Sequence, residues 1–365
     1  MSIKPFSIAV LETDLERLYQ KLDAATFPDE RDNAGWDMGV PLAEIKRLTA
    51  YWRDGFNWRE HEQKLNDDLK QFTVPVPVDG FEDLDIHYLH HTSKTPGAIP
   101  LLFLHGWPGS FKEATKLIPL LTSGDDNKPA FDVIAPGFGL HQYAEAIHGV
   151  MTSLGYKEYV IQGGDWGSFI ARKMARLYPQ HTKAIHLNFI TLRFPMPWEN
   201  PSFFLTNLLP IPFSQERKAY LSSVIHYFTK ENGYMIQQAT RPQTINYALA
   251  DSPVALLAWI YDKLHLWTDG YSWTDDEILT WSLLKVVSKP APDSVKIGVA
   301  QFKEEVMRYP MSWTKLLGNV VRATGYPRGG HFAAWEVHEL LVGNLQQFLG
   351  RDGPAFGVVT GKNGF

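Results

Sequence analysis

The amino-acid sequence predicts a protein of the α/β class with a mostly parallel sheet. Apolar runs of strand length alternate with helix-like segments between residues 91 and 194, and the alternation returns after residue 293. Such alternation is typical of parallel strands that helices cover on both faces. Between the two α/β parts, residues 195–292 begin with many prolines and continue with helix-like segments. The chain is therefore expected to form one sheet that a helical insertion interrupts.

The composition is that of an ordinary globular protein, with 44% apolar and 21% charged residues in a chain of 365. The formal net charge of −5 gives no reason to expect a nucleic-acid partner. The chain has no cysteine, which excludes disulfides, thiolate metal ligands and a cysteine nucleophile. The charged N-terminus and the lack of an apolar run of about 18 residues predict no signal peptide and no transmembrane segment, so the expected location is cytoplasmic. Aromatic residues make up 13% of the chain, which fits a large apolar pocket, although core packing alone could use them.

Residues 1–90 are predicted to form a separate N-terminal region. Apolar residues recur at helical spacing in residues 14–24, 41–56 and 58–72. Residues 84–90 alternate between apolar and polar side chains, as a strand does. Three helices are too few to form much of a core. The region is therefore expected to cover or brace the rest of the protein.

The α/β core is predicted in two parts, residues 91–194 and 293–365. Its first part has apolar runs of strand length and helix-like segments, namely strands at 99–104, 131–135, 159–161 and 184–187 and helices at 140–154 and 169–178. Its second part has strands at 296–300 and 319–322 and a closing helix at 337–349. The glycine-rich tail at 351–365 is expected to be mobile.

The insertion, residues 195–292, is interpreted as a helical lid. Its helix-like segments are residues 215–227, 233–238, 244–249 and 254–267.

Residues 159–178 are expected to form a strand, a sharp turn and a helix. The turn contains Gly163-Gly164-Asp165-Trp166-Gly167, whose spacing matches the elbow that holds a nucleophile above an α/β-hydrolase sheet. Gly163 and Gly167 fit because the strained turn leaves no room for a Cβ atom. Asp165 stands in the nucleophile position, and a carboxylate can attack an sp3 carbon without a base and form an ester. The alternative is that Asp165 only caps the helix.

The order nucleophile, acid, histidine along the chain predicts the partners of Asp165. His331 follows two glycines after the last predicted strand, where its ring can face a pocket. Glu305 lies shortly after the strand at 296–300. We expect His331 to act as a base, and Glu305 to bind its ring, fix the tautomer and stabilise the charged form. Glu304 is the alternative acid, and each of these residues could instead be structural.

A second loop, His105-Gly106-Trp107-Pro108, follows the strand at 99–104. In α/β hydrolases this loop supplies one N–H group of an oxyanion hole, and the residue after the nucleophile supplies the other. The expected donors are therefore the backbone N–H groups of Trp107 and Trp166. Pro108 is a candidate for a cis peptide bond. The alternative is that the loop is an ordinary turn.

The chain resembles the epoxide hydrolases of the α/β-hydrolase superfamily, in particular the microsomal and fungal branch with an extra N-terminal region. The segments that carry the resemblance are residues 52–65, 105–110, 163–168, 233–242 and 329–336. It spans nearly the whole chain; residues 52–65 are its most specific part, whereas the elbow and the loop at 105–110 are shared with related dehalogenases.

The resemblance implies that Asp165 opens an epoxide and becomes an ester. His331, backed by Glu305, then activates the water that releases a vicinal diol. The resemblance further implies no cofactor and no metal ion, a small organic epoxide as partner and a role in detoxification. The resemblance is compatible with a homodimer but does not require one.

In this family two lid tyrosines donate to the epoxide oxygen, and Tyr234 matches the first of them; the alternative is that Tyr234 is a buried helix residue with a satisfied hydroxyl. The segment that should carry the second departs from the family pattern from Ser282 to Ser294, and the sequence has no tyrosine between Tyr271 and Tyr309. The loop after residue 135 is also shorter than the family usually has. A site with one donor should open epoxides more slowly, since a lost donor costs about 2.7–4 kcal/mol.

Two other functions stay open at this point. A haloalkane dehalogenase also uses an aspartate nucleophile, but it would not need Tyr234, and the N-terminal segment argues against it. A catalytically impaired relative that binds a hydrophobic ligand would explain the missing second tyrosine. It would leave Asp165, Glu305 and His331 without a purpose.

Overall fold

The computed structural model describes residues 2–78, 83–125, 127–137, 143–191, 198, 201, 215–282, 296–317 and 319–365. Within these residues the chain forms a nine-stranded sheet in the order β1-β2-β3-β5-β4-β6-β7-β8-β9. Its strands are β1 (Lys4–Pro5), β2 (Gln71–Val76), β3 (Leu84–His91), β4 (Ile99–Leu104), β5 (Phe131–Pro136), β6 (Tyr159–Gly163), β7 (Thr182–Leu187), β8 (Lys296–Gln301) and β9 (Val320–Gly325).

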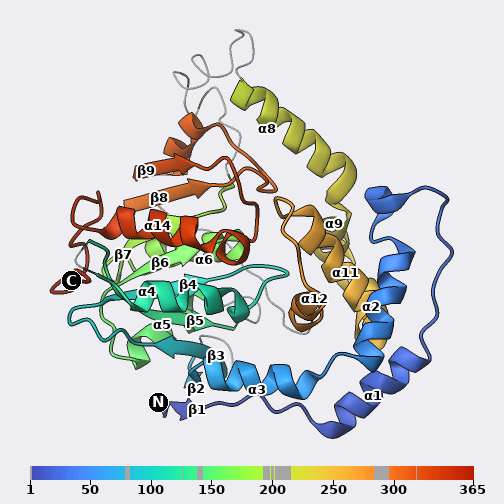
Figure 1. Ribbon diagram of the computed structural model, residues 1–365. Coiled ribbons are helices and arrows are strands. Elements are labelled where there is room, and N and C mark those ends of the chain that lie inside the picture. Colours follow the sequence, from blue (N-terminus) through green and yellow to red (C-terminus); the bar gives the residue numbers. More distant parts are fainter. Residues whose placement is uncertain are drawn as a thin grey trace.

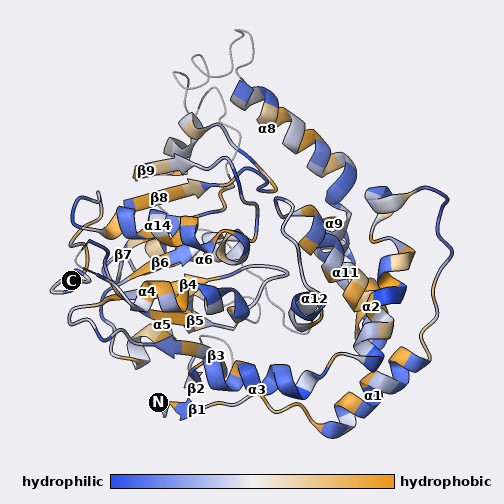
Figure 2. Ribbon diagram, in the orientation of Figure 1, coloured by the Kyte–Doolittle hydropathy of each residue, from blue (hydrophilic) through white to orange (hydrophobic). Residues whose placement is uncertain are grey.

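The pairing of the strands confirms the predicted α/β class. From β5 through β4, β6, β7 and β8 to β9 every neighbouring pair is parallel. The strands β1, β2 and β3 extend the sheet in antiparallel fashion next to β5. The central strands β4, β5 and β6 are buried along their whole length, which explains why their sequences are almost entirely apolar. In Figure 2 orange stretches mark apolar residues of the sheet.

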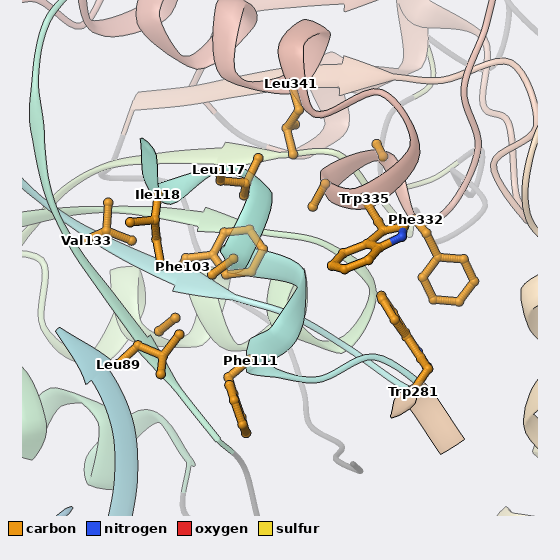
Figure 3. Close-up of a cluster of buried hydrophobic side chains, with 14 of the residues drawn as sticks. Leu89, Phe103, Phe111, Leu117, Ile118, Val133, Trp281, Phe332, Trp335 and Leu341 are labelled. Atoms are coloured by element: carbon orange, nitrogen blue, oxygen red, sulfur yellow. The ribbon is translucent and has the colours of Figure 1, made fainter. Parts of the chain in front are cut away.

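Helices cover both faces of this sheet (Figure 1). One apolar core holds residues of α5 (Tyr143–Ser153) and α6 (Asp165–Leu177) on one face. A second core holds residues of α4 (Ile118–Thr122), α13 (Ala333–Glu336) and α14 (His338–Leu349). Figure 3 shows part of this second core, where Phe103 of β4 and Leu117 lie on one side and the rings of Trp281, Phe332 and Trp335 gather on the other.

The N-terminal region contains the three predicted helices, α1 (Glu12–Asp23), α2 (Leu42–Asp54) and α3 (Trp58–Asp68). The third was predicted to reach residue 72, which is wrong, because the chain turns into β2 after it. The strand β2 contains Pro75, and proline disfavours a strand. On the side away from β3, β1 pairs only with Phe72 and Thr73, so Pro75 faces no neighbouring strand there and is tolerated. Burial of Val74 and Val76 favours the strand.

The lid lies between β7 and β8 and includes α8 (Gln215–His226), α9 (Gly233–Thr240), α10 (Pro242–Asp251), α11 (Pro253–Leu266) and α12 (Asp275–Ser282). The predicted lid helices are thus present, with bounds that differ by a few residues. The helices α1 and α2 pack against α11, and Figure 1 shows them curving around this side of the lid. Arg47 and Tyr51 of α2 bind Asp275 and Asp276 at the start of α12, so polar contacts also join the N-terminal region to the lid.

The tail was predicted to be mobile, and the structure contradicts this. Ala355 and Val359 are buried. The backbone N–H of Ala130 donates to the carbonyl of Gly364, whose own N–H donates to Gly97. Glycine content indicated flexibility, but these contacts tie the tail to the sheet. In the described part of the chain, no helix combines the length and apolar character needed to cross a membrane.

Candidate active site

The elbow predicted from the glycine spacing lies between β6 and α6. Asp165 begins the helix with a backbone φ of +43°, in the left-handed region that residues other than glycine rarely adopt. A Cβ atom on Gly163 would lie 2.5 Å from the carbonyl oxygen of Gly167, and one on Gly167 would lie 2.1 Å from that of Leu104. Both positions therefore require glycine, and the turn holds Asp165 at the carboxyl end of the central strand.

The alternative role of Asp165 as a helix cap is wrong, because the cap residue is Gly164. The Asp165 carboxylate instead receives the backbone N–H of Trp107, with N···Oδ1 at 2.6 Å, and a second bond from the backbone N–H of Trp166. The two N–H groups named as oxyanion-hole donors thus both bind this side chain. The peptide bond before Pro108 is cis, as the sequence suggested.

The loops after β8 and β9 bring an acid and a histidine to the same edge of the sheet. Nε2 of His331 lies 3.6 Å from Oδ2 of Asp165. Nδ1 of His331 lies 2.6 Å from Oε1 of Glu305, and both of these side chains are almost fully buried, at 4% and 1% exposed. Carboxyl ends of parallel strands meet at one edge, which is why residues far apart in sequence converge here.

Glu304, the alternative acid, points elsewhere. Its side chain is 36% exposed and pairs with Lys303 at 3.2 Å and Arg308 at 3.8 Å. Its backbone N–H donates to the carbonyl of Gly329, which fixes the strand-like path of the loop. Neighbouring side chains on an extended segment face opposite sides, so Glu305 faces inward.

The charges of this site shift the pKa values of its members. Burial raises the pKa of Asp165, while His331 and the two N–H donors oppose that rise. Burial would lower the pKa of His331, but Glu305, Asp165 and Glu113 together raise it, to about 9. Opposite charges stabilise each other in a buried place, so a protonated His331 favours the ionised form of Asp165, and the charge of Asp165 in turn favours protonated His331.

Tyr234 of α9 lies over the oxyanion-hole loop. Its ring stacks on that of Trp107, with centroids 4.9 Å apart and planes 7° apart, and its edge meets Trp267. The hydroxyl oxygen of Tyr227 lies 3.5 Å from that of Tyr234. The aromatic residues that suggested a large apolar pocket thus pack partly against one another here.

Two residues at the site were not predicted, Glu113 and Tyr227. Glu113 is buried and lines a small cavity together with Asp165 and His331. Burial raises its pKa to about 8. The short distance of Glu113 from the loop at 105–110 was an available signal for it. No sequence signal marked Tyr227, since its position depends on how the lid folds.

Other polar groups line the same cavity, including Gln162 and Asn188, whose side chains bind each other at 2.6 Å. Among the described residues, no group of three or more His, Asp or Glu side chains is arranged to hold a metal ion. The shortened loop after residue 135 extends into residues 138–142, and the divergent lid segment covers residues 283–295. Both lie outside the described residues.

The parallel sheet, the elbow and the convergence of a carboxylate, a histidine and a second acid define an α/β hydrolase with aspartate in the nucleophile position. Comparisons with known proteins agree. Residues 3–114 match the model of the epoxide hydrolase N terminus, and residues 99–219 match that of the alpha/beta hydrolase fold. Each match covers about a third of the chain, and together they span the N-terminal region, the first part of the core and the start of the lid.

Individual relatives extend this similarity over nearly the whole chain. Epoxide hydrolase 1 of Sus scrofa is 31% identical over 96% of this chain and 89% of its own length. Juvenile hormone epoxide hydrolase 1 of Ctenocephalides felis is 33% identical over 94% of this chain and 85% of its own. The crystal structure of juvenile hormone epoxide hydrolase from Bombyx mori superposes with a TM-score of 0.81, at 29% identity, over 94% of this chain and 93% of that one. The chain belongs to the epoxide hydrolase family.

Proposed function

We propose that the protein hydrolyses an organic epoxide to a vicinal diol through an ester on Asp165. The observation that carries the proposal is the set of contacts around this carboxylate. One oxygen faces the N–H of Trp107, and the other lies 3.6 Å from the ring of His331. A carboxylate held in this way is oriented to attack carbon, and the N–H donors can stabilise the oxyanion that forms later.

The first step would open the ring. Asp165 attacks one epoxide carbon, the carbon–oxygen bond breaks, and the electron pair stays on the oxygen. An alkoxide is a poor leaving group, so an acid must donate a proton to it. Tyr234 is the proposed donor, since burial raises the pKa of its hydroxyl and keeps it protonated at neutral pH.

The second step would release the diol. Ester formation removes the negative charge of Asp165, which is one of the charges that raise the pKa of His331. The pKa of His331 then falls, and the neutral ring can take a proton from water. Attack on the ester carbonyl gives an oxyanion that faces the N–H groups of Trp107 and Trp166. The water molecule that hydrolyses the ester supplies both protons that the cycle needs. One passes through His331 to the leaving alkoxide, and the other returns to Tyr234.

The alternatives can be compared with the same observations. A dehalogenase would need side chains that hold a halide and would gain nothing from Tyr234. A binding protein without activity would have no need for His331 between two carboxylates, because burying charged groups costs desolvation free energy even when they are paired. Family membership and the hydroxyl near the site both favour epoxide hydrolysis.

The proposal is tested by incubating the protein with styrene oxide and, separately, with a bromoalkane. Diol formation that is lost in Asp165→Ala and kept in Asp29→Ala, a change at an exposed aspartate, would support it. Bromide release without diol formation would favour a dehalogenase. Thermal stabilisation by styrene oxide with neither product would favour the binding protein. A cytoplasmic location, a homodimer and a role in detoxification stay predictions from the sequence.

A further inference from the structure

Tyr227 lies in the lid where α8 ends and a π-helical turn, Tyr227–Glu231, begins. It is 3% exposed, although its neighbours Ile225 and Phe228 are more than half exposed. Its hydroxyl oxygen lies 3.5 Å from that of Tyr234. In a straight helix two residues seven apart lie on one face but about 10 Å apart along the axis. The wide turn between α8 and α9 therefore brings together two hydroxyls that a continuous helix would separate.

The hydroxyl of Tyr227 keeps its proton available. Its partners are the hydroxyl of Tyr234 and, at 3.3 Å, the sulfur of Met235. A thioether is a weak acceptor, so no carboxylate or carbonyl among these partners competes for the proton. A stronger acceptor that enters beside Tyr234 would therefore receive it.

Two other tyrosines, Tyr271 and Tyr309, have different partners. Tyr271 donates to Glu277 at 2.9 Å and receives Lys116 at 3.0 Å. The ring of Tyr309 packs against Tyr220. In the part of the chain that the structure describes, Tyr227 is the tyrosine whose hydroxyl lies within hydrogen-bond reach of that of Tyr234.

We propose that Tyr227 is a second catalytic acid, which donates to the epoxide oxygen together with Tyr234. The inference rests on the proposed function. When Asp165 attacks carbon, the oxygen that leaves gains negative charge, and two converging O–H groups share it. One proton moves to the oxygen and the other hydroxyl stays hydrogen-bonded; the proton is later replaced from the hydrolytic water. The chain thus compensates for the tyrosine that the segment after Ser282 lacks.

The electrostatics of the site agree with this role. Burial raises the pKa of Tyr227; the bond from Tyr234 lowers it, and the charge of Asp165 raises it. The charge of Asp165 also raises the pKa of Tyr234. Both hydroxyls are therefore within electrostatic reach of the nucleophile, and both are protonated at neutral pH.

The test measures how fast styrene oxide alkylates Asp165. In a His331→Gln background the ester should accumulate, and its formation can be followed by mass spectrometry after rapid quenching. Tyr227→Phe and Tyr234→Phe keep the ring and its packing, and each should slow alkylation by about 10²–10³-fold. The double variant should be slower than either. Tyr220→Phe is the matched control, since Tyr220 lies on α8 but packs against Tyr309 and Trp313, and it should leave the rate within about twofold.

An alkylation rate in Tyr227→Phe equal to that of the background protein would overturn the inference. So would a double variant that is no slower than Tyr234→Phe, because Tyr227 would then only position Tyr234. Failure of the proposed function looks different: the protein with native Tyr227 would form neither ester nor diol. Thermal melting of Tyr227→Phe checks that the fold is intact.

Discussion

His331 lies between two carboxylates, with its Nε2 atom 3.6 Å from Oδ2 of Asp165 and its Nδ1 atom 2.6 Å from Oε1 of Glu305. The three side chains come from the ends of β6, β9 and β8. One ring nitrogen is thus held by a buried acid while the other faces the proposed nucleophile. This arrangement fixes the tautomer and leaves one nitrogen free to exchange a proton with water.

Gly106 leaves the space that Asp165 fills. A Cβ atom at this position would lie 2.2 Å from both Cβ and Oδ1 of Asp165. Gly106→Ala must therefore displace the carboxylate from the N–H of Trp107, and we expect diol formation to fall by about 10²-fold or more. The matched control is Gly343→Ala in α14, where a Cβ atom would meet nothing within 4 Å. That change should keep activity and stabilise the fold by roughly 0.5–1 kcal/mol. Equal activity in the two variants would contradict the assigned position of Asp165.

Glu305 and Glu304 offer a comparison between neighbours. Glu305→Gln removes the charge that helps to raise the pKa of His331, so this pKa should fall. Ester hydrolysis needs neutral His331, so the rising limb of its pH profile should move to lower pH, and its plateau should drop by about 10²-fold or more. Glu304→Gln changes a side chain that pairs with Lys303 and should leave the profile unchanged. Stopped-flow or quenched measurements of ester decay over pH 5–10 would show whether the two variants differ as predicted.

The sequence predicted the local features of the site better than its tertiary ones. The elbow around Asp165 follows from glycine spacing, and that constraint acts within a few residues. The choice between Glu304 and Glu305 depends on which side of an extended loop faces the sheet, and composition does not reveal this. The strand β2 was missed because Pro75 is unfavourable in most strands, and only the short reach of β1 makes it acceptable.

Tyr227 and Glu113 show a second limit. Each becomes relevant to the site only through packing. The hydroxyl of Tyr227 reaches Tyr234 because the lid helix widens and turns. Glu113 faces the cavity because Gly109 has no side chain, since a Cβ atom there would lie 1.7 Å from Oε1 of Glu113. Contacts between segments of this kind cannot be derived from helical or strand periodicity.

Glu113 should make stability depend on pH. Its pKa is raised by burial to about 8, above the value of 4.5 that it has when unfolded. Between these values the folded protein holds a proton that the unfolded chain releases, so stability should fall as the pH rises from about 4.5 to 8. The glutamine side chain in Glu113→Gln cannot ionise, so over the same pH range this variant should lose a few kcal/mol less of its free energy of unfolding. Urea unfolding at pH 5, 6.5 and 8 measures it. Parallel curves for the two proteins would show that Glu113 does not titrate in this way.

The central claim is that Asp165 becomes an ester, and mass spectrometry of the His331→Gln variant after incubation with styrene oxide tests it most directly. The predicted result is a protein heavier by one styrene oxide, with the added mass on the peptide that contains Asp165, and no added mass when Asp165→Ala is combined with His331→Gln. An unmodified Asp165 peptide, in a variant whose wild-type parent converts styrene oxide to its diol, would contradict the account.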